Sequence, residues 1–171
     1  HLLEALRPDV GFALDCAVGT TFSLDLMALL AAPLAFTFFG LRENETPQGV
    51  DPVKLLNALQ RHAGHIHLFC QAGRTQTPAR HHPLYAFMES SVIEVQAKKA
   101  HRVFHPKIWV LRYVGHGDDQ GSVRYRVLCL SRNLTFDRSW DTALVLSGDL
   151  RLDRPRQEWV TPLAEFLTAL P

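Results

Sequence analysis

The stretch HRVFHPKIWVLRY, residues 101–113, carries a strong β-strand signal. Residues 108–111 are apolar and include branched and aromatic side chains, which favour strands. His105 and Lys107 interrupt the apolar pattern two residues apart, and side chains at that spacing project from the same face of a strand. A charged lysine in apolar surroundings needs a polar partner, so we predict a ligand site on this face.

A polar pair with the same spacing, Ser131 and Asn133, follows in VLCLSRNLTFDRSWD, residues 127–141. The turn GHGDDQGS separates the two stretches and predicts an antiparallel hairpin. With its loop centred on that turn, the hairpin places His105 opposite Asn133. Lys107 then lies opposite Ser131. Directly opposed Cβ atoms are roughly 4.5 to 5.5 Å apart, so all four side chains can meet one small ligand.

An ammonium, an imidazole, an amide and a hydroxyl at one point supply an excess of hydrogen-bond donors. This set suits a phosphate better than a neutral substrate. An imidazole held beside a phosphate can attack phosphorus and form a covalent intermediate. Asp141 begins the next expected strand, where its carboxylate can accept the other imidazole N–H and fix the tautomer.

The motif HPK followed by SRN resembles the phospholipase D superfamily, whose pattern is HxK, an optional Asp and then Ser-x-Asn. The resemblance covers roughly residues 92–148 and includes the trailing WDTALVLSG. It implies a phosphodiesterase that works without a metal ion or other cofactor. The implied site residues are the nucleophile His105, which forms a phosphohistidine, the phosphate binders Lys107 and Asn133, the supporting donor Ser131, and Asp141 as the carboxylate that orients the histidine.

The sequence departs from the family pattern in two ways. The optional Asp would fall at Arg112 and is therefore missing, and the tyrosyl-DNA phosphodiesterase branch of the family lacks this Asp as well. A complete site in this family uses two HxK motifs, one histidine attacking and the other protonating the leaving group, and this chain carries one. We expect the second histidine either from another copy across a two-fold axis or from sequence beyond this chain. The first residue is His1 rather than Met, which favours a fragment.

Strand and helix signals alternate over the rest of the sequence, which predicts one α/β domain over residues 1–171. We expect a mixed sheet flanked by helices on both faces, the sandwich that the resemblance also implies. The expected strands cover residues 12–18, 34–39, 65–73, 92–97, 107–114, 123–131 and 142–148. The expected helices are one capped by Thr21 or Ser23 and ended or kinked by Pro33, and others over residues 51–64 with Asp51 as cap, 81–91 and 155–170.

Charge and composition help to predict whether the protein binds nucleic acid or lipid. The apolar share of 47% is enough to fill a core, and the formal net charge of +1 does not mark a strongly basic nucleic-acid-binding protein. Basic residues nevertheless cluster near the motif and would neutralise backbone phosphates, which favours nucleic acid, DNA above all, over lipid. These residues are Lys98, Lys99, Arg102, Arg132 and Arg138.

Other functional classes fit the sequence less well. The apolar segment 24–40 contains Pro33 and is too short for a membrane span. His65 and His67 lack cysteines or carboxylates at metal-ligand spacing, so we expect no metal site. The three cysteines lie far apart without a CxxC spacing, which indicates a reducing, cytoplasmic compartment.

The leading hypothesis is therefore a metal-independent nuclease that cleaves DNA through a phosphohistidine. A phospholipase or transphosphatidylase acting on lipid is the first alternative. The second is a non-catalytic half-domain that binds phosphate or nucleic acid but lacks the second HxK.

Overall fold

The structure, a computed structural model, describes residues 2–37, 52–76, 83–97, 99, 101–137, 139–150 and 160–171. The strands are β1 (Phe12–Thr21), β2 (Leu24–Asp25), β3 (Ile66–Gln71), β4 (Thr75–Gln76), β5 (Val92–Val95), β6 (Ile108–Gly115), β7 (Val123–Leu130) and β8 (Ala143–Asp149). The helices are α1 (Leu2–Ala5), α2 (Leu26–Thr37), α3 (Pro52–His62), α4 (Tyr85–Glu89) and α5 (Thr161–Thr168), with short 3-10 turns at Ala63–His65 and Gly117–Asp119.

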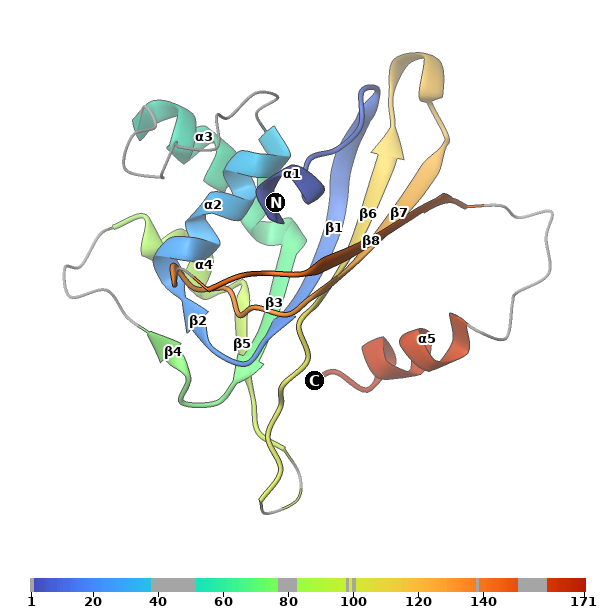
Figure 1. Ribbon diagram of the computed structural model, residues 1–171. Helices are drawn as coiled ribbons and strands as arrows, with labels where there is room; N and C mark the ends of the chain where they lie inside the picture. Colours follow the sequence, from blue (N-terminus) through green and yellow to red (C-terminus); the bar gives the residue numbers. More distant parts are fainter. Residues whose placement is uncertain are drawn as a thin grey trace.

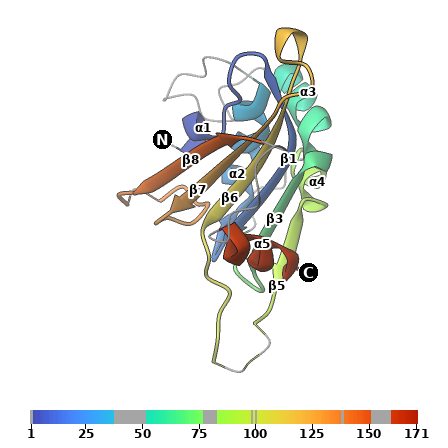
Figure 2. The same ribbon diagram turned by 90° about the vertical axis from the view of Figure 1, so that its right-hand side faces the viewer.

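Six strands form one mixed sheet in the order β5-β3-β1-β6-β7-β8, and β2 and β4 form a separate two-stranded ladder. Figures 1 and 2 show α1 to α4 on one face of the large sheet and α5 beside the opposite face. The predicted fold class, an α/β protein with a mixed sheet flanked by helices, is confirmed.

The central strand β1 divides the sheet into a parallel and an antiparallel half. β1 pairs in parallel with β3, and β3 pairs in parallel with β5. On its other side β1 pairs antiparallel with β6, which continues antiparallel into β7 and β8. The carboxyl ends of the three parallel strands therefore meet the beginning of β6 at one edge, the place where α/β sheets commonly bind ligands.

The core lies between the sheet and α2. Trp109, Leu111 and Tyr113 alternate along β6 and face this core, each no more than 1% exposed. Gly19 on β1 makes room for the tryptophan, because a Cβ there would lie 2.7 Å from Leu68 Cδ1 and 3.0 Å from Trp109 Cε2. A side chain at this glycine would require the buried Leu68 and Trp109 side chains to shift.

Helix α2 corrects two predictions. It runs through Pro33 to Thr37, so the expected strand over residues 34–39 is wrong for 34–37, and residues 38 and 39 lie outside the described residues. Ten of its twelve residues are buried, and a helix buried all round has no amphipathic stripe to distinguish it from a strand. Its cap is Asp25, whose Oδ1 accepts the Met27 N–H at 2.8 Å, rather than Thr21 or Ser23.

The other predicted elements agree with the structure, with small differences at their ends. The expected cap Asp51, residues 81 and 82 of the expected helix over 81–91 and residues 155–159 of the last expected helix lie outside the described residues. Among the described helices, none is long and apolar enough to cross a membrane, and α2, in the segment tested for a span, has 12 residues.

Strand β8 is the edge of the antiparallel half and is exposed along its whole length. Leu144, Val145 and Leu146 are 55%, 45% and 52% exposed. Successive strand residues point to opposite faces, so apolar side chains are open on both sides of this edge.

His62, at the end of α3, makes the fold sensitive to pH. The side chain is 4% exposed, neither ring nitrogen has a hydrogen-bond partner among the described residues, and the Phe36 ring lies 5.8 Å away between centroids. Burial, with smaller contributions from the charges of Arg61 and His65, lowers the pKa of His62 from 6.5 to about 4. The folded protein thus keeps this imidazole neutral at pH values where the unfolded chain protonates it.

We predict that the free energy of unfolding falls as the pH drops from 6.5 towards 4, by up to about 1.4 kcal/mol for each pH unit from this group. Urea denaturation at a series of pH values measures the slope. A His62→Leu variant should show a flatter profile between these pH values, whereas His116→Leu, which changes an exposed histidine, should keep the wild-type slope. An unchanged slope in His62→Leu would contradict the assignment.

Candidate active site

His105 and Lys107 lie in the irregular segment that leads into β6, at the carboxyl edge of the parallel strands. Their predicted place on a strand is wrong, because β6 begins at Ile108. Pro106 stands between them and cannot donate a hydrogen bond to a neighbouring strand. The segment is nevertheless fixed, since Ile108 N–H donates to Thr20 Oγ1 at 2.9 Å.

The ammonium of Lys107 lies against the imidazole of His105. Its Nζ is 3.0 Å from Nδ1 and 3.2 Å from Nε2. A hydrogen bond along the lone pair of one ring nitrogen would leave the other nitrogen much farther away, so the near-equal distances place the ammonium over the ring face. This contact therefore leaves the in-plane positions of the two ring nitrogens open. Burial lowers the pKa of Lys107.

The pairing of β6 with β7 differs by one residue from the predicted register. Ile108 pairs with Cys129, and Leu130 N–H donates to Lys107 O at 2.9 Å. Lys107 thus lies opposite Leu130 rather than Ser131, and the predicted pairs of His105 with Asn133 and of Lys107 with Ser131 are wrong. The hairpin connection contains a 3-10 turn at Gly117–Asp119.

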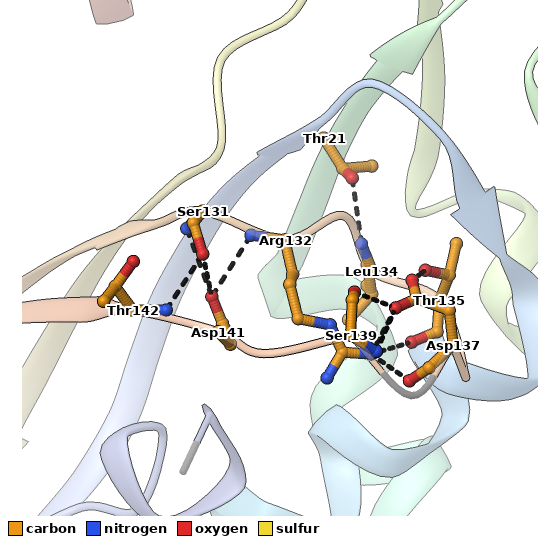
Figure 3. Close-up of polar contacts among 9 residues, drawn as sticks. All are labelled: Thr21, Ser131, Arg132, Leu134, Thr135, Asp137, Ser139, Asp141 and Thr142. Carbon is orange, nitrogen blue, oxygen red and sulfur yellow. Dashed lines mark hydrogen bonds and ion pairs between the residues drawn. The ribbon is translucent and has the colours of Figure 1, made fainter.

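Asn133 reaches the site by another route. After β7 the chain leaves the hairpin and crosses the end of β1, where Leu134 N–H donates to Thr21 Oγ1 at 3.0 Å, as Figure 3 shows. Asp25 N–H donates to Leu134 O at 2.9 Å. Phe22 N–H donates to Asn133 Oδ1 at 3.2 Å. This bond orients the amide, because a backbone N–H can pair only with its oxygen, and it leaves the two side-chain N–H donors available.

Phe22 brings these groups together. Its ring contacts the His105 ring with centroids 4.8 Å apart, while its backbone holds Asn133. The guanidinium carbon of Arg74 lies 5.3 Å from the same ring centroid. Neither Phe22 nor Arg74 was singled out from the sequence. Their positions just after the first and third strands are the signal that could have found them, because loops after parallel strands form ligand sites.

Ser131 and Asp141 lie near the two ends of the connection between β7 and β8, a wide turn whose base they close (Figure 3). Asp141 Oδ1 accepts hydrogen bonds from Ser131 N at 3.1 Å, Ser131 Oγ at 2.9 Å and Arg132 N at 3.1 Å. Ser131 Oγ also accepts the Thr142 N–H at 2.9 Å. Within the described residues no contact joins Asp141 to His105. The geometry gives the carboxylate a role in closing this turn and does not support its predicted role of orienting the histidine.

Arg132 folds back onto its own loop. Its Nη2 donates to the backbone oxygens of Thr135 and Asp137 and lies 3.2 Å from Asp137 Oδ1 (Figure 3). The Asp137 carboxylate is in turn held by Ser139 and Thr135, whose hydroxyls lower its pKa. A guanidinium engaged in this way is poorly placed for the nucleic-acid contact predicted from the sequence.

Two of the remaining basic residues predicted to contact nucleic acid are exposed. They are Lys99 and Arg102, on the segment that precedes His105. Lys98 and Arg138 lie outside the described residues. In the part of the chain that the structure describes, no three His, Cys, Asp or Glu side chains form a group that could hold a metal ion.

No protein-family model, curated protein or solved structure matches the chain.

The buried hydroxyl of Thr21 should be essential to the crossing. It accepts the Leu134 N–H and donates to Ser23 O at 2.8 Å, and Thr21 is 1% exposed. We predict that Thr21→Val, which keeps the shape and removes both bonds, lowers the free energy of unfolding by about 1–3 kcal/mol. Urea denaturation measures the loss. Thr142→Val, at an exposed threonine, is the control and should change stability little. Equal stabilities of the two variants would contradict this role.

Proposed function

We propose that this protein is a phosphodiesterase of the phospholipase D type that cleaves a nucleic-acid strand, DNA in the first instance, through a phosphohistidine at His105. The observation that carries the proposal is the arrangement around Phe22. The His105 imidazole, with the Lys107 ammonium over its face, contacts the Phe22 ring, and the backbone of Phe22 holds the Asn133 amide, whose N–H donors have no partner among the described residues. Phe22 thus links the proposed nucleophile to a proposed phosphate-binding donor.

The proposed reaction uses these groups in two steps. The lone pair of a His105 ring nitrogen attacks phosphorus, the bond from phosphorus to the leaving oxygen breaks, and a proton passes to that oxygen. Water then attacks the phosphohistidine, which breaks the P–N bond and restores the imidazole. Lys107 and Asn133 donate hydrogen bonds to the non-bridging oxygens, where negative charge gathers in the transition state.

The proton in the first step requires a second acid. The attacking imidazole must be neutral and the acid must be charged, so one histidine cannot fill both roles in the same step. We assign the second role to a histidine from another copy of this chain or from sequence beyond it. Without that partner the chain would bind phosphate and would not turn over.

Phospholipase activity remains the second candidate, and one observation favours it. Trp140 and Phe136, in the loop after Asn133, are 99% and 52% exposed, a feature suited to a lipid surface. Exposed aromatic rings stack equally well on unpaired bases, and the exposed cations Lys99 and Arg102 favour a polyanionic strand.

We predict that His105→Ala lowers the rate of phosphodiester cleavage by on the order of 10³-fold or more, because the nucleophile is lost. Cleavage of plasmid DNA and of bis(4-nitrophenyl) phosphate in EDTA measures this, with phosphatidylcholine vesicles as the competing substrate. His116→Ala, an exposed histidine in the β6–β7 connection, is the matched control and should keep full activity. Light scattering on the same sample shows whether the active species contains two copies. A strict Mg²⁺ requirement, or an active His105→Ala variant, would contradict the proposal.

A second substitution tests the amide. Asn133→Asp keeps an oxygen to accept the Phe22 N–H but removes both donors and adds a negative charge. We predict that the melting temperature changes little while the dissociation constant for inorganic phosphate rises roughly 10- to 100-fold, the loss of a hydrogen bond to a charged group. Calorimetry measures both. Asn57→Asp, exposed on α3, makes the same change away from the site and should leave phosphate binding unaltered. Unaltered binding in Asn133→Asp would remove this residue from the site.

A further inference from the structure

Arg74 is a cation that the proposed reaction does not use. It is exposed, and in the part of the chain that the structure describes its guanidinium is paired with no carboxylate. The guanidinium carbon lies 5.3 Å from the centroid of the Phe22 ring. Contact with a ring face holds a guanidinium in place and leaves its N–H donors, which lie at the edge of the group, free to bind an anion.

Backbone hydrogen bonds hold the loop that carries Arg74 to the end of β3 and to β2. Arg74 N–H donates to Gln71 O at 3.0 Å, and Leu24 N–H donates to Arg74 O at 3.1 Å. Gly73 has a φ of 70°, which suits glycine and allows the tight turn after β3. The Gln71 side chain in turn accepts the Phe104 N–H at 2.6 Å, next to His105. The arginine and the histidine are therefore attached to one framework.

The Phe22 ring limits the distance between the Arg74 guanidinium and the His105 imidazole, because both contact it. The His105 ring centroid is 4.8 Å from the Phe22 ring centroid, and the Arg74 guanidinium carbon is 5.3 Å from the same centroid. The guanidinium carbon therefore lies within about 10 Å of the His105 ring centroid. One nucleic-acid strand in a duplex carries a phosphate about every 3.4 Å of helix axis, so a span of about 10 Å along a strand holds more than one phosphate. A strand attacked by His105 can therefore place a neighbouring phosphate near Arg74.

We propose that Arg74 binds a phosphate next to the one attacked by His105, and that Phe22 is a positioning residue that holds the cation and the imidazole at this spacing. The inference rests on the proposed function and makes it more specific. The preferred substrate is a strand with consecutive phosphates, and a lone phosphodiester leaves Arg74 without a partner.

The experiment compares Arg74→Gln with the wild-type chain on two substrates. For a fluorescein-labelled oligothymidylate, we expect affinity to fall about tenfold at low salt, and the slope of log K against log salt to decrease by about 0.7, the value for one phosphate contact on a single strand. For bis(4-nitrophenyl) phosphate, which has one phosphate, we expect kcat/KM to stay unchanged. Arg61→Gln, at an exposed arginine on α3, removes the same charge elsewhere and should change neither measurement.

The possible outcomes separate the proposed role of Arg74 from the proposed phosphodiesterase function. If oligothymidylate affinity and its salt slope are unaltered in Arg74→Gln while cleavage still depends on His105, the inference alone is overturned. If the small diester is affected as strongly as the oligonucleotide, Arg74 acts at the attacked phosphate and the inference is also overturned. If the wild-type chain binds phosphatidylcholine vesicles and no oligonucleotide, the proposed function fails together with the inference.

The role of Phe22 needs a readout of its own. Phe22→Leu removes the ring and should weaken oligothymidylate binding about as much as Arg74→Gln, while Phe22→Tyr, which keeps the ring, should restore it. Introducing Arg74→Gln into the Phe22→Leu chain should then have little further effect. If the two losses simply add, the ring does not position the arginine.

Discussion

The hydrogen bonds between the end of β1 and the residues after β7 hold the candidate site together. Leu134 N–H donates to Thr21 Oγ1, and Phe22 N–H donates to Asn133 Oδ1. On the neighbouring side Ile108 N–H donates to Thr20 Oγ1, which fixes the segment that carries the histidine. Consecutive residues at the carboxyl end of one central strand therefore position the two segments that carry His105 and Asn133. A sheet with a parallel and an antiparallel half makes this possible, because it brings strand ends of both kinds to the same edge.

The sequence was sufficient for the fold class because alternation is strong where one face of a strand is buried. β6 is the clearest example, with Trp109, Leu111 and Tyr113 inside and less buried residues between them. The pattern failed in the segment after Pro33, where an unbroken apolar run fits a buried helix as well as a buried strand. The hairpin register failed for a different reason. A connection of several residues can centre itself on more than one position, and a shift of one residue changes every opposed pair.

The motif spacing identified His105, Lys107 and Asn133 as candidates but not the way in which they meet. The expected meeting was across a hairpin, whereas Asn133 arrives through a loop that leaves β7 and contacts the end of β1. Phe22, around which this happens, has no motif of its own, and its significance depends on contacts with residues far away in the chain. Asp141 shows the converse case, a residue with the expected spacing whose hydrogen bonds serve a local turn. Spacing along the chain therefore predicted the candidate residues better than it predicted which residues contact one another.

The hydrogen bond between Phe22 and Asn133 joins residues 111 positions apart, which has a consequence for how the site forms during synthesis. The β6–β7 hairpin is a local structure and can close within microseconds once its residues are free. The crossing at Thr21 cannot form until the ribosome has released Leu134, and closure of so long a loop must be compensated by contacts made at the same moment. A nascent chain can therefore hold His105 in place before the Asn133 amide has arrived, so the candidate site is completed later than the first half of the sheet.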